Sequence, residues 1–344
     1  MIKNNHSIGI LLTNIGTPEH CDRFSVRNYL RQFLNDPRVI KLPKLIRFAL
    51  LEGFILRTRP KKSLEAYQKI WQPTGSPLKI LTESLAQKLE QKIVNFFDSP
   101  FPIHVTYGMS YSQPSIKQAL SLLIDKHQCE KLIVIPLYPQ ASATTTCSTF
   151  DFIAQDFLKR EFIPSLTFIN QYADYPPYIE AICQKILVSK QDKKDWHLLL
   201  SFHGIPQDYV KAGDRYEEFC RLTTSKIKET LNLKESDYTL SFQSRLGPRA
   251  WLKPYTSEIL KELPKRGIKK ILAICPGFSI DCLETLEEIS MQNKEIFFES
   301  GGEQFEYIPA LNDDKEQINL LFQLVKPYLS QLDEFEIKMP LISD

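Results

Sequence analysis

Short apolar runs recur along the chain, and each ends at or near a glycine or a proline. The runs cover residues 8–15, 131–137, 197–202 and 270–275. Runs of this length between turn residues are typical of strands that are buried on both faces of a parallel sheet. The pattern therefore predicts a strand at each of these four positions.

Apolar residues at helical spacing fill the intervals between the runs. They recur in this way within 26–34, 85–96, 116–124 and 318–325. Strands that alternate with helices predict an α/β fold, in which helices cover both faces of a parallel sheet.

The spacing of the four runs predicts two domains. A chain of 344 residues, 43% of them hydrophobic, is long enough to build two cores. The sequence ADYPP at 173–177 breaks regular structure. We therefore expect a first domain over 1–173 and a second over 174–311. Residues 312–344 are expected to form a closing helix that packs back on the first domain.

Charge and cysteine usage exclude several classes of protein. The formal net charge is +2 and no basic, aromatic-interleaved motif is present, which argues against a nucleic-acid partner. The seven cysteines include no CxxC pair, which argues against disulfides and structural zinc and indicates a reducing compartment. The N-terminus lacks a signal-peptide pattern, and no apolar stretch has the length of a membrane span. These features predict a cytoplasmic protein.

The segment 42–56, LPKLIRFALLEGFIL, is strongly apolar but is interrupted by Lys44, Arg47 and Glu52. An interfacial helix, a buried helix and a lip beside a ligand site all fit this pattern. We expect burial or a ligand-binding lip. As a lip, the segment would make peripheral membrane contact, with Lys44 and Arg47 near anionic lipid.

The segment 275–288, CPGFSIDCLETLEE, places Asp281, Glu284 and Glu288 directly after an apolar run. Spacings of three and four residues put these carboxylates on one face of a helix. Such a row beside a cleft can hold a divalent cation or carry protons away from a reacting centre. The alternative is a solvated helix face whose acidic first turn complements the helix dipole.

His203 follows the apolar run 197–202. In open α/β sheets, ligands bind at the carboxyl ends of the strands, and Gly204 and Pro206 stop the predicted strand there. The imidazole is expected either to point into a ligand site or to be a core histidine with a backbone partner.

Six loop segments resemble those of ferrochelatases, in the order of that family and over nearly the whole chain. The specific part is the pairing of SFHG with a downstream DxLETL. The segments are TNIGTPE (13–19), GMSYSQPS (108–115), PLYPQASATTT (136–146), SFHGIP (201–206), SFQSRLGPRAWLKPYT (241–256) and PGFSIDCLETLEE (276–288).

The resemblance implies two Rossmann-like, chelatase-type domains with a porphyrin cleft between them. It also implies a lyase that inserts ferrous iron into protoporphyrin IX and forms protohaem with release of two protons. Iron and porphyrin are then substrates, and no cofactor is bound permanently. A neutral imidazole and carboxylates suit this chemistry because imidazole binds Fe(II) and both groups accept protons.

The resemblance further implies a set of site residues. His203 and Glu284 flank the metal path as catalytic and metal-binding groups, and Asp281 and Glu288 match further acidic positions of the catalytic pattern. The implied porphyrin contacts are Ile15, Ser76, Tyr111, Trp251 and Phe278, and the candidate partners of the propionates are Arg27, Arg31 and Arg59.

This chain departs from the family pattern in three places. Cys282 stands where many members have histidine, and Ser110 stands where some have arginine. No cysteine follows Cys282, so we expect no iron–sulfur cluster. Residue types leave coproporphyrin III or cobalt open as substrates, and a non-catalytic porphyrin carrier as another class. Retention of both His203 and Glu284 argues against a carrier.

Overall fold

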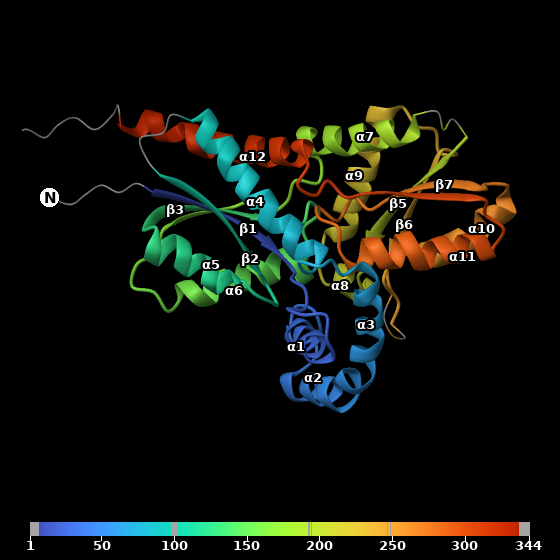
Figure 1. Cartoon of the computed structure of the whole chain (residues 1–344), viewed down its shortest axis with the longest axis horizontal. Helices are drawn as coiled ribbons and strands as arrows, with labels where there is room; N and C mark the ends of the chain where they lie inside the picture. The colour runs from blue at the N-terminus through green and yellow to red at the C-terminus, as the bar shows by residue number, and fades with distance from the viewer. Residues whose placement is uncertain are drawn as a thin grey trace, which may run out of the picture.

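The computed structural model describes residues 7–97, 102–191, 193, 195–245, 247 and 249–336. Two four-stranded sheets, in the orders β2-β1-β3-β4 and β6-β5-β7-β8, organise the first and second halves of the molecule (Figure 1). All their strand pairs are parallel. The strands are β1 (Ser7–Asn14), β2 (Ile103–Met109), β3 (Cys129–Pro136), β4 (Ser165–Phe168), β5 (His197–His203), β6 (Tyr238–Gln243), β7 (Lys270–Ile274) and β8 (Gln304–Ile308).

The four predicted strands are confirmed as β1, β3, β5 and β7, which are the inner strands of the two sheets. The apolar pattern missed the edge strands β2, β4, β6 and β8. Inner strands read as continuous apolar runs, whereas the edge strands carry polar residues such as His104 and Thr106 in β2 and Glu306 in β8. Strands with this composition give no distinct apolar run.

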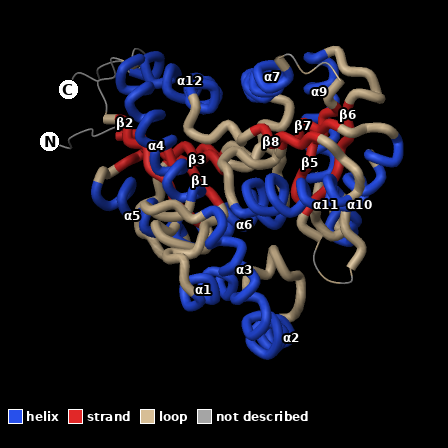
Figure 2. Tube along the Cα trace, turned by 45° about the vertical axis from the view of Figure 1, so that its right-hand side comes forward, coloured by secondary structure: helices blue, strands red, loops and turns tan. Residues whose placement is uncertain are grey.

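Helices cover both faces of each sheet, which confirms the predicted α/β architecture (Figure 2). The α-helices are α1 (Arg23–Leu34), α2 (Lys44–Leu50), α3 (Leu56–Ile70), α4 (Pro77–Phe96), α5 (Ile116–Ser121), α6 (Ser148–Phe157), α7 (Pro176–Lys190), α8 (Gln207–Lys211), α9 (Tyr216–Leu231), α10 (Thr256–Glu262), α11 (Lys294–Glu299) and α12 (Lys315–Glu336). The π-helical segments are η1 (Leu51–Ile55), η2 (Leu122–Lys126), η3 (Ala143–Cys147) and η5 (Glu284–Asn293), and η4 (Pro264–Arg266) is a 3₁₀ turn.

Alternate residues of each inner strand enter different apolar cores. In β1, Ile10 and Leu12 join a core with side chains of α4, whereas Leu11 joins a core with side chains of α5. In β5, Leu200 joins the same core as Ile10, whereas Leu199 joins a separate core of the second half. The core that contains Ile10 also contains Leu200, so one continuous apolar core spans both halves.

The C-terminal helix α12 lies across both halves. It packs against α4 of the first half and also against α7 of the second (Figures 1 and 2). Leu321 and Val325 of α12 are fully buried. Residues 337–344 of the expected closing segment lie outside the described residues, and the exact domain boundaries stay a prediction.

The segment 42–56 forms α2 and η1, which project with α1 and α3 below the two sheets (Figure 1). We call this segment the lip. Leu45, Phe48 and Phe54 are 83%, 59% and 65% exposed, so much of the apolar surface of the lip faces solvent instead of being buried. None of the described helices is long and apolar enough to cross a membrane.

Arg47 corrects one expectation about the lip. Its side chain is buried, and its Nη1 donates hydrogen bonds to the carbonyl oxygens of Leu42 at 2.8 Å and Ile40 at 3.4 Å. The guanidinium satisfies carbonyl groups before α2 and is therefore not available to an anionic membrane surface. Lys44 remains exposed.

Candidate active site

His203 is the last residue of β5, so its predicted place at the carboxyl edge of the sheet is confirmed. The next residue is glycine for a steric reason. A Cβ at Gly204 would lie 2.9 Å from the carbonyl oxygen of Gln243 and 3.3 Å from the ring of Trp251. The Gly204 N–H donates to the same carbonyl at 2.8 Å. This close approach brings the loop that carries Trp251 beside the end of β5.

The hydrogen bond of His203 defines its neutral tautomer. Its Nδ1 lies 2.6 Å from the carbonyl oxygen of Gly204. Because a carbonyl oxygen can only accept, Nδ1 is the donor, and in the neutral ring Nε2 keeps its lone pair. The ring of Phe278 lies 6.4 Å away, centroid to centroid. The half-buried imidazole therefore has a nitrogen suited to bind a metal or accept a proton.

Glu284 and Glu288 lie on η5, which is a π-helix where we expected an α-helix. Hydrogen bonds from i to i+5 distinguish this element, and π-helical turns occur frequently at functional sites. Asp281 precedes the helix. The three carboxylates therefore do not form the single α-helical row that the spacing predicted.

Asp281 is buried in a hydrogen-bond network of its own. Its Oδ1 accepts from the hydroxyls of Tyr307 at 2.6 Å and Thr285 at 2.8 Å. Its Oδ2 accepts from Nδ2 of Asn312 at 2.8 Å, and its N–H donates to Oδ1 of that asparagine at 2.8 Å. These contacts tie the start of η5 to β8 and to the chain that follows it. They commit both oxygens of Asp281 to protein donors, which does not favour its predicted catalytic role.

Glu288 is held by Ser244, which the sequence did not reveal as a site residue. The Ser244 N–H donates to Oε1 of Glu288 at 2.8 Å, and its hydroxyl donates to Oε2. Ser244 has φ of 65°, in the left-handed region that is uncommon for serine. Its place in the segment 241–256 was the only sequence signal, because no spacing rule links it to Glu288.

The pKa of Glu288 is raised, chiefly by burial. The Ser244 hydrogen bonds and the nearby His203 oppose this rise, while Glu284 adds to it. His203 pairs with Gln243 across β5 and β6, Gln243 binds the backbone of Glu284, and Ser244 binds Glu288. These contacts bring His203, Glu284 and Glu288 together. Within the described residues, no three histidine, cysteine, aspartate or glutamate side chains form a ready-made metal cluster.

Gln243 supports the first turn of η5 and is also a residue that the sequence did not reveal. Its Nε2 donates to the backbone oxygen of Glu284 at 2.8 Å. Its Oε1 accepts from the hydroxyl of Ser201 in β5 at 2.7 Å. Strand ends of the second sheet thus fix the helix that carries the two glutamates.

Several predicted porphyrin contacts lie on the loops at the carboxyl edges. The side chains of Ile15, Trp251 and Phe278 are half-buried and keep part of their apolar surface exposed. Ser76 is buried, and its hydroxyl oxygen accepts from the hydroxyl of Thr17 at 2.8 Å. A serine hydroxyl in this arrangement can still donate one hydrogen bond.

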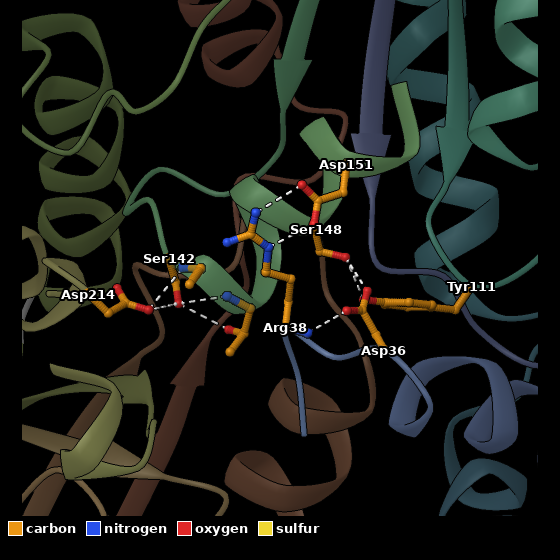
Figure 3. Close-up of polar contacts among 9 residues, drawn as sticks. Asp36, Arg38, Tyr111, Ser142, Ser148, Asp151 and Asp214 are labelled. Atoms are coloured by element: carbon orange, nitrogen blue, oxygen red, sulfur yellow. Dashed lines mark hydrogen bonds and ion pairs between the residues drawn. The ribbon is translucent and has the colours of Figure 1, made fainter. Parts of the chain in front are cut away.

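Tyr111 departs from the predicted role of a porphyrin wall. Its side chain is only 3% exposed and packs in the core of α1 and α3. Its hydroxyl donates to Oδ2 of Asp36 at 2.7 Å and lies 2.8 Å from the hydroxyl of Ser148 (Figure 3). The phenol therefore ties the chain after α1 to α6 and presents little surface to a ligand.

The same region joins the two halves (Figure 3). Arg38 donates to both oxygens of Asp151, at 2.7 and 2.9 Å, in a bidentate ion pair. Asp214 of the second half accepts from the hydroxyl of Ser142 at 2.8 Å and from the N–H of Ala143 at 2.9 Å. The Arg38 contact fastens the chain that leads into the lip, whereas the Asp214 contacts join the second half to the start of η3. Neither was predictable from local sequence.

The three candidate arginines differ in their partners. Nη2 of Arg27 lies 3.0 Å and Nε of Arg31 lies 2.6 Å from oxygens of Glu52, so both guanidinium groups already have a carboxylate. Arg59 is half-buried, and burial lowers its pKa. No carboxylate of the described residues forms an ion pair with Arg59, which makes it the most available of the three.

Cys282 is buried, directly after Asp281 and two residues before the first residue of η5. Burial, followed by the charge of Glu284, raises the pKa of its thiol well above the usual value. The side chain therefore remains a protonated thiol, whereas metal binding requires the thiolate.

Comparisons with known proteins address the identity of the chain. The family model described as "Ferrochelatase" matches residues 7–329. The chain is 45% identical to the ferrochelatase of Idiomarina loihiensis, over 93% of this chain and 87% of that protein. It is 44% identical to the ferrochelatase of Hamiltonella defensa, over 94% of this chain and 99% of that protein.

Solved structures support the predicted chelatase-type fold. SirB from Bacillus subtilis with Fe3+ has a TM-score of 0.53 at 12% identity, over 73% of this chain and 91% of that chain. The sirohydrochlorin chelatase SirB from Bacillus subtilis subspecies spizizenii in complex with cobalt has a TM-score of 0.52 at 10% identity, over 93% and 94%. At these identities the likeness concerns the fold alone. On the family match and the two close relatives, this chain belongs to the ferrochelatase family.

Proposed function

We propose that this chain is a ferrochelatase, which inserts ferrous iron into protoporphyrin IX and forms protohaem with release of two protons. The observation that carries the proposal is that contacts through Gln243 and Ser244 bring His203, Glu284 and Glu288 together at the carboxyl edge of the second sheet. Family membership adds the class of reaction.

The reaction requires two pyrrole N–H groups to lose their protons while the iron loses bound water. Nε2 of His203 is available to bind Fe2+ or to accept a proton. Glu284 offers carboxylate oxygens to the same ion. Glu288, whose pKa is raised mainly by burial, binds a proton more readily than an exposed carboxylate does, which suits it to accept a pyrrole proton and pass it on.

The porphyrin is proposed to lie in a cleft between the domains 1–173 and 174–311. Ile15 follows β1 in the first domain, while Trp251 and Phe278 lie on loops of the second. Their exposed apolar and aromatic surfaces suit the flat faces of a macrocycle.

We further propose that Arg59 binds a propionate of the porphyrin. A guanidinium binds a carboxylate in a fork, and the described residues give Arg59 no carboxylate of their own. Ser76 can donate its remaining hydrogen bond to a carboxylate. Arg27 and Arg31 are weaker candidates because a propionate would have to displace Glu52.

The enzyme is proposed to work in the cytoplasm, in peripheral contact with the membrane through the lip. The exposed side chains of Leu45, Phe48 and Phe54 can enter the interfacial region, and Lys44 adds attraction to anionic lipid. Such contact is weak and reversible, and it would give a poorly soluble porphyrin a short route to the site.

We propose that the chain carries no iron–sulfur cluster and no other permanently bound cofactor. Cluster iron is held by thiolates, and no cysteine follows Cys282 in the sequence. Anaerobically purified protein should contain no stoichiometric acid-labile sulfide, and finding it would refute this part of the proposal.

Anaerobic incubation with ferrous iron tests the proposed reaction. With protoporphyrin IX, the absorption spectrum should change to that of protohaem over many turnovers. Competition with coproporphyrin III measures the preference between the two porphyrins. Binding of protoporphyrin without conversion to haem would identify a carrier and contradict the proposal.

A further inference from the structure

One ion pair joins α3, which follows the lip, to the π-helix η5 of the second half. Nζ of Lys69 lies 2.7 Å from Oε1 of Glu287. The Glu287 side chain is 3% exposed, whereas that of Lys69 is 52% exposed. Nε2 of Gln292 donates to the other oxygen of Glu287 at 2.5 Å. The pair therefore holds a buried carboxylate of η5 from the side of the first half.

Apolar packing surrounds this ion pair. Tyr67 and Ile70 of α3 belong to an apolar cluster of the first half, and Leu283 and Leu286 of the second half pack against it. The charges also suit the helix ends, because Lys69 lies in the last turn of α3 and Glu287 in the first turn of η5. The interface is thus built to bring these two helices together.

Glu287 lies beside the glutamates of the proposed site, so its ion pair affects the geometry of that site. Glu287 directly precedes Glu288 on η5 and lies in the same first turn as Glu284. On the other side, α3 leads through a short turn to Ser76 at the start of α4. The spacing between α3 and η5 therefore sets the distance between porphyrin contacts of the first half and the glutamates of the second.

We propose that Lys69 and Glu287 are positioning residues that fix the spacing between the two sides of the porphyrin site. Loss of Lys69 would leave a buried carboxylate without its cation, a costly state that separation of α3 from η5 relieves by admitting water. Porphyrin, which contacts both sides, would then bind more weakly. This inference rests on the proposed function and assigns a role to two residues outside the reacting groups.

Kinetics of a matched set of variants test this proposal. We expect Lys69→Met and Glu287→Gln each to raise the KM for porphyrin by roughly tenfold, within the range of couplings between contacting residues. The KM for ferrous iron should stay within about twofold, because Gln243 and Ser244 hold the glutamates independently. The KM for porphyrin of the double variant should be no higher than that of either single variant. Lys69→Arg, which keeps the positive charge, should have the wild-type KM.

Lys62→Met is the matched control, since Lys62 is an exposed lysine of the same helix with no ion pair to a described carboxylate. Lower thermal stability with unchanged porphyrin KM would reduce the pair to a structural role and overturn the proposal. Additive effects in the double variant would also overturn it. Absence of haem formation by the wild type would instead refute the proposed function, and fluorescence titration of porphyrin binding would then test the positioning role separately.

Discussion

At the scale of single residues, Asp281 and Glu288 show that environment decides what a carboxylate can do. Asp281 is surrounded by protein donors, while Glu288 has a pKa raised by burial beside His203 and Glu284. The sequence pattern could not separate them, because the Asp281 partners Tyr307 and Asn312 lie 26 and 31 residues later in the chain. Spacing alone predicted one row of three equivalent carboxylates.

Asp281→Asn should destabilise the protein by about 1–3 kcal/mol, because the new amide group would face a donor of Asn312 or of the hydroxyls in the network. Chemical denaturation measures this loss. The double variant Asp281→Asn/Asn312→Asp restores a donor–acceptor match and should recover most of the stability and the activity. If stability returns but haem formation remains lost, Asp281 takes part in proton transfer and the structural account of it is wrong.

Cys282→Ala should retain most of the activity, whereas Glu284→Ala should lose roughly a hundredfold or more. The thiol is buried and its raised pKa keeps it protonated, so its removal takes no ligand from the metal path. Turnover with ferrous and zinc ions at saturating porphyrin makes the comparison. An equal loss in both variants would place the thiol in the metal path.

At the scale of elements, the sequence predicted the inner strands and the amphipathic helices but missed the edge strands. The inner strands and the amphipathic helices were predictable because burial imposes a period on their apolar residues. Edge strands such as β2 and β8 carry polar residues and lack that signal. The π-helical form of η5 was also missed, since its residues fit an α-helical pattern equally well.

The exposed apolar side chains of the lip predict that it binds lipid. Leu45→Ser/Phe48→Ser should weaken binding to anionic liposomes by roughly tenfold or more, because two exposed apolar side chains lose their partition into the interface. Flotation assays measure the bound fraction. Leu187→Ser/Val188→Ser, which removes exposed apolar surface from α7, is the control. Equal binding of the lip variant and the wild type would exclude lipid contact through the lip.

At the scale of the whole molecule, the two halves repeat one strand order, and the proposed site lies on loops at the carboxyl edges. The number of units and the place of His203 followed from the apolar runs and their ends. The joints between the halves did not follow, because Asp214 with Ser142 and Lys69 with Glu287 are far apart in sequence. Side chains that meet only through tertiary packing leave no periodic signal.

The most direct test of metal insertion by this chain compares His203→Ala with the wild type under anaerobic conditions, with ferrous iron and protoporphyrin IX. Fluorescence titration should give a porphyrin Kd within about twofold of wild type, because the apolar loops are unchanged. Haem formation should fall by far more than tenfold. A tenfold fall corresponds to a loss of about 1.4 kcal/mol of transition-state stabilisation. A folded His203→Ala protein that keeps more than about a tenth of the wild-type kcat would contradict a role of this imidazole in metal insertion.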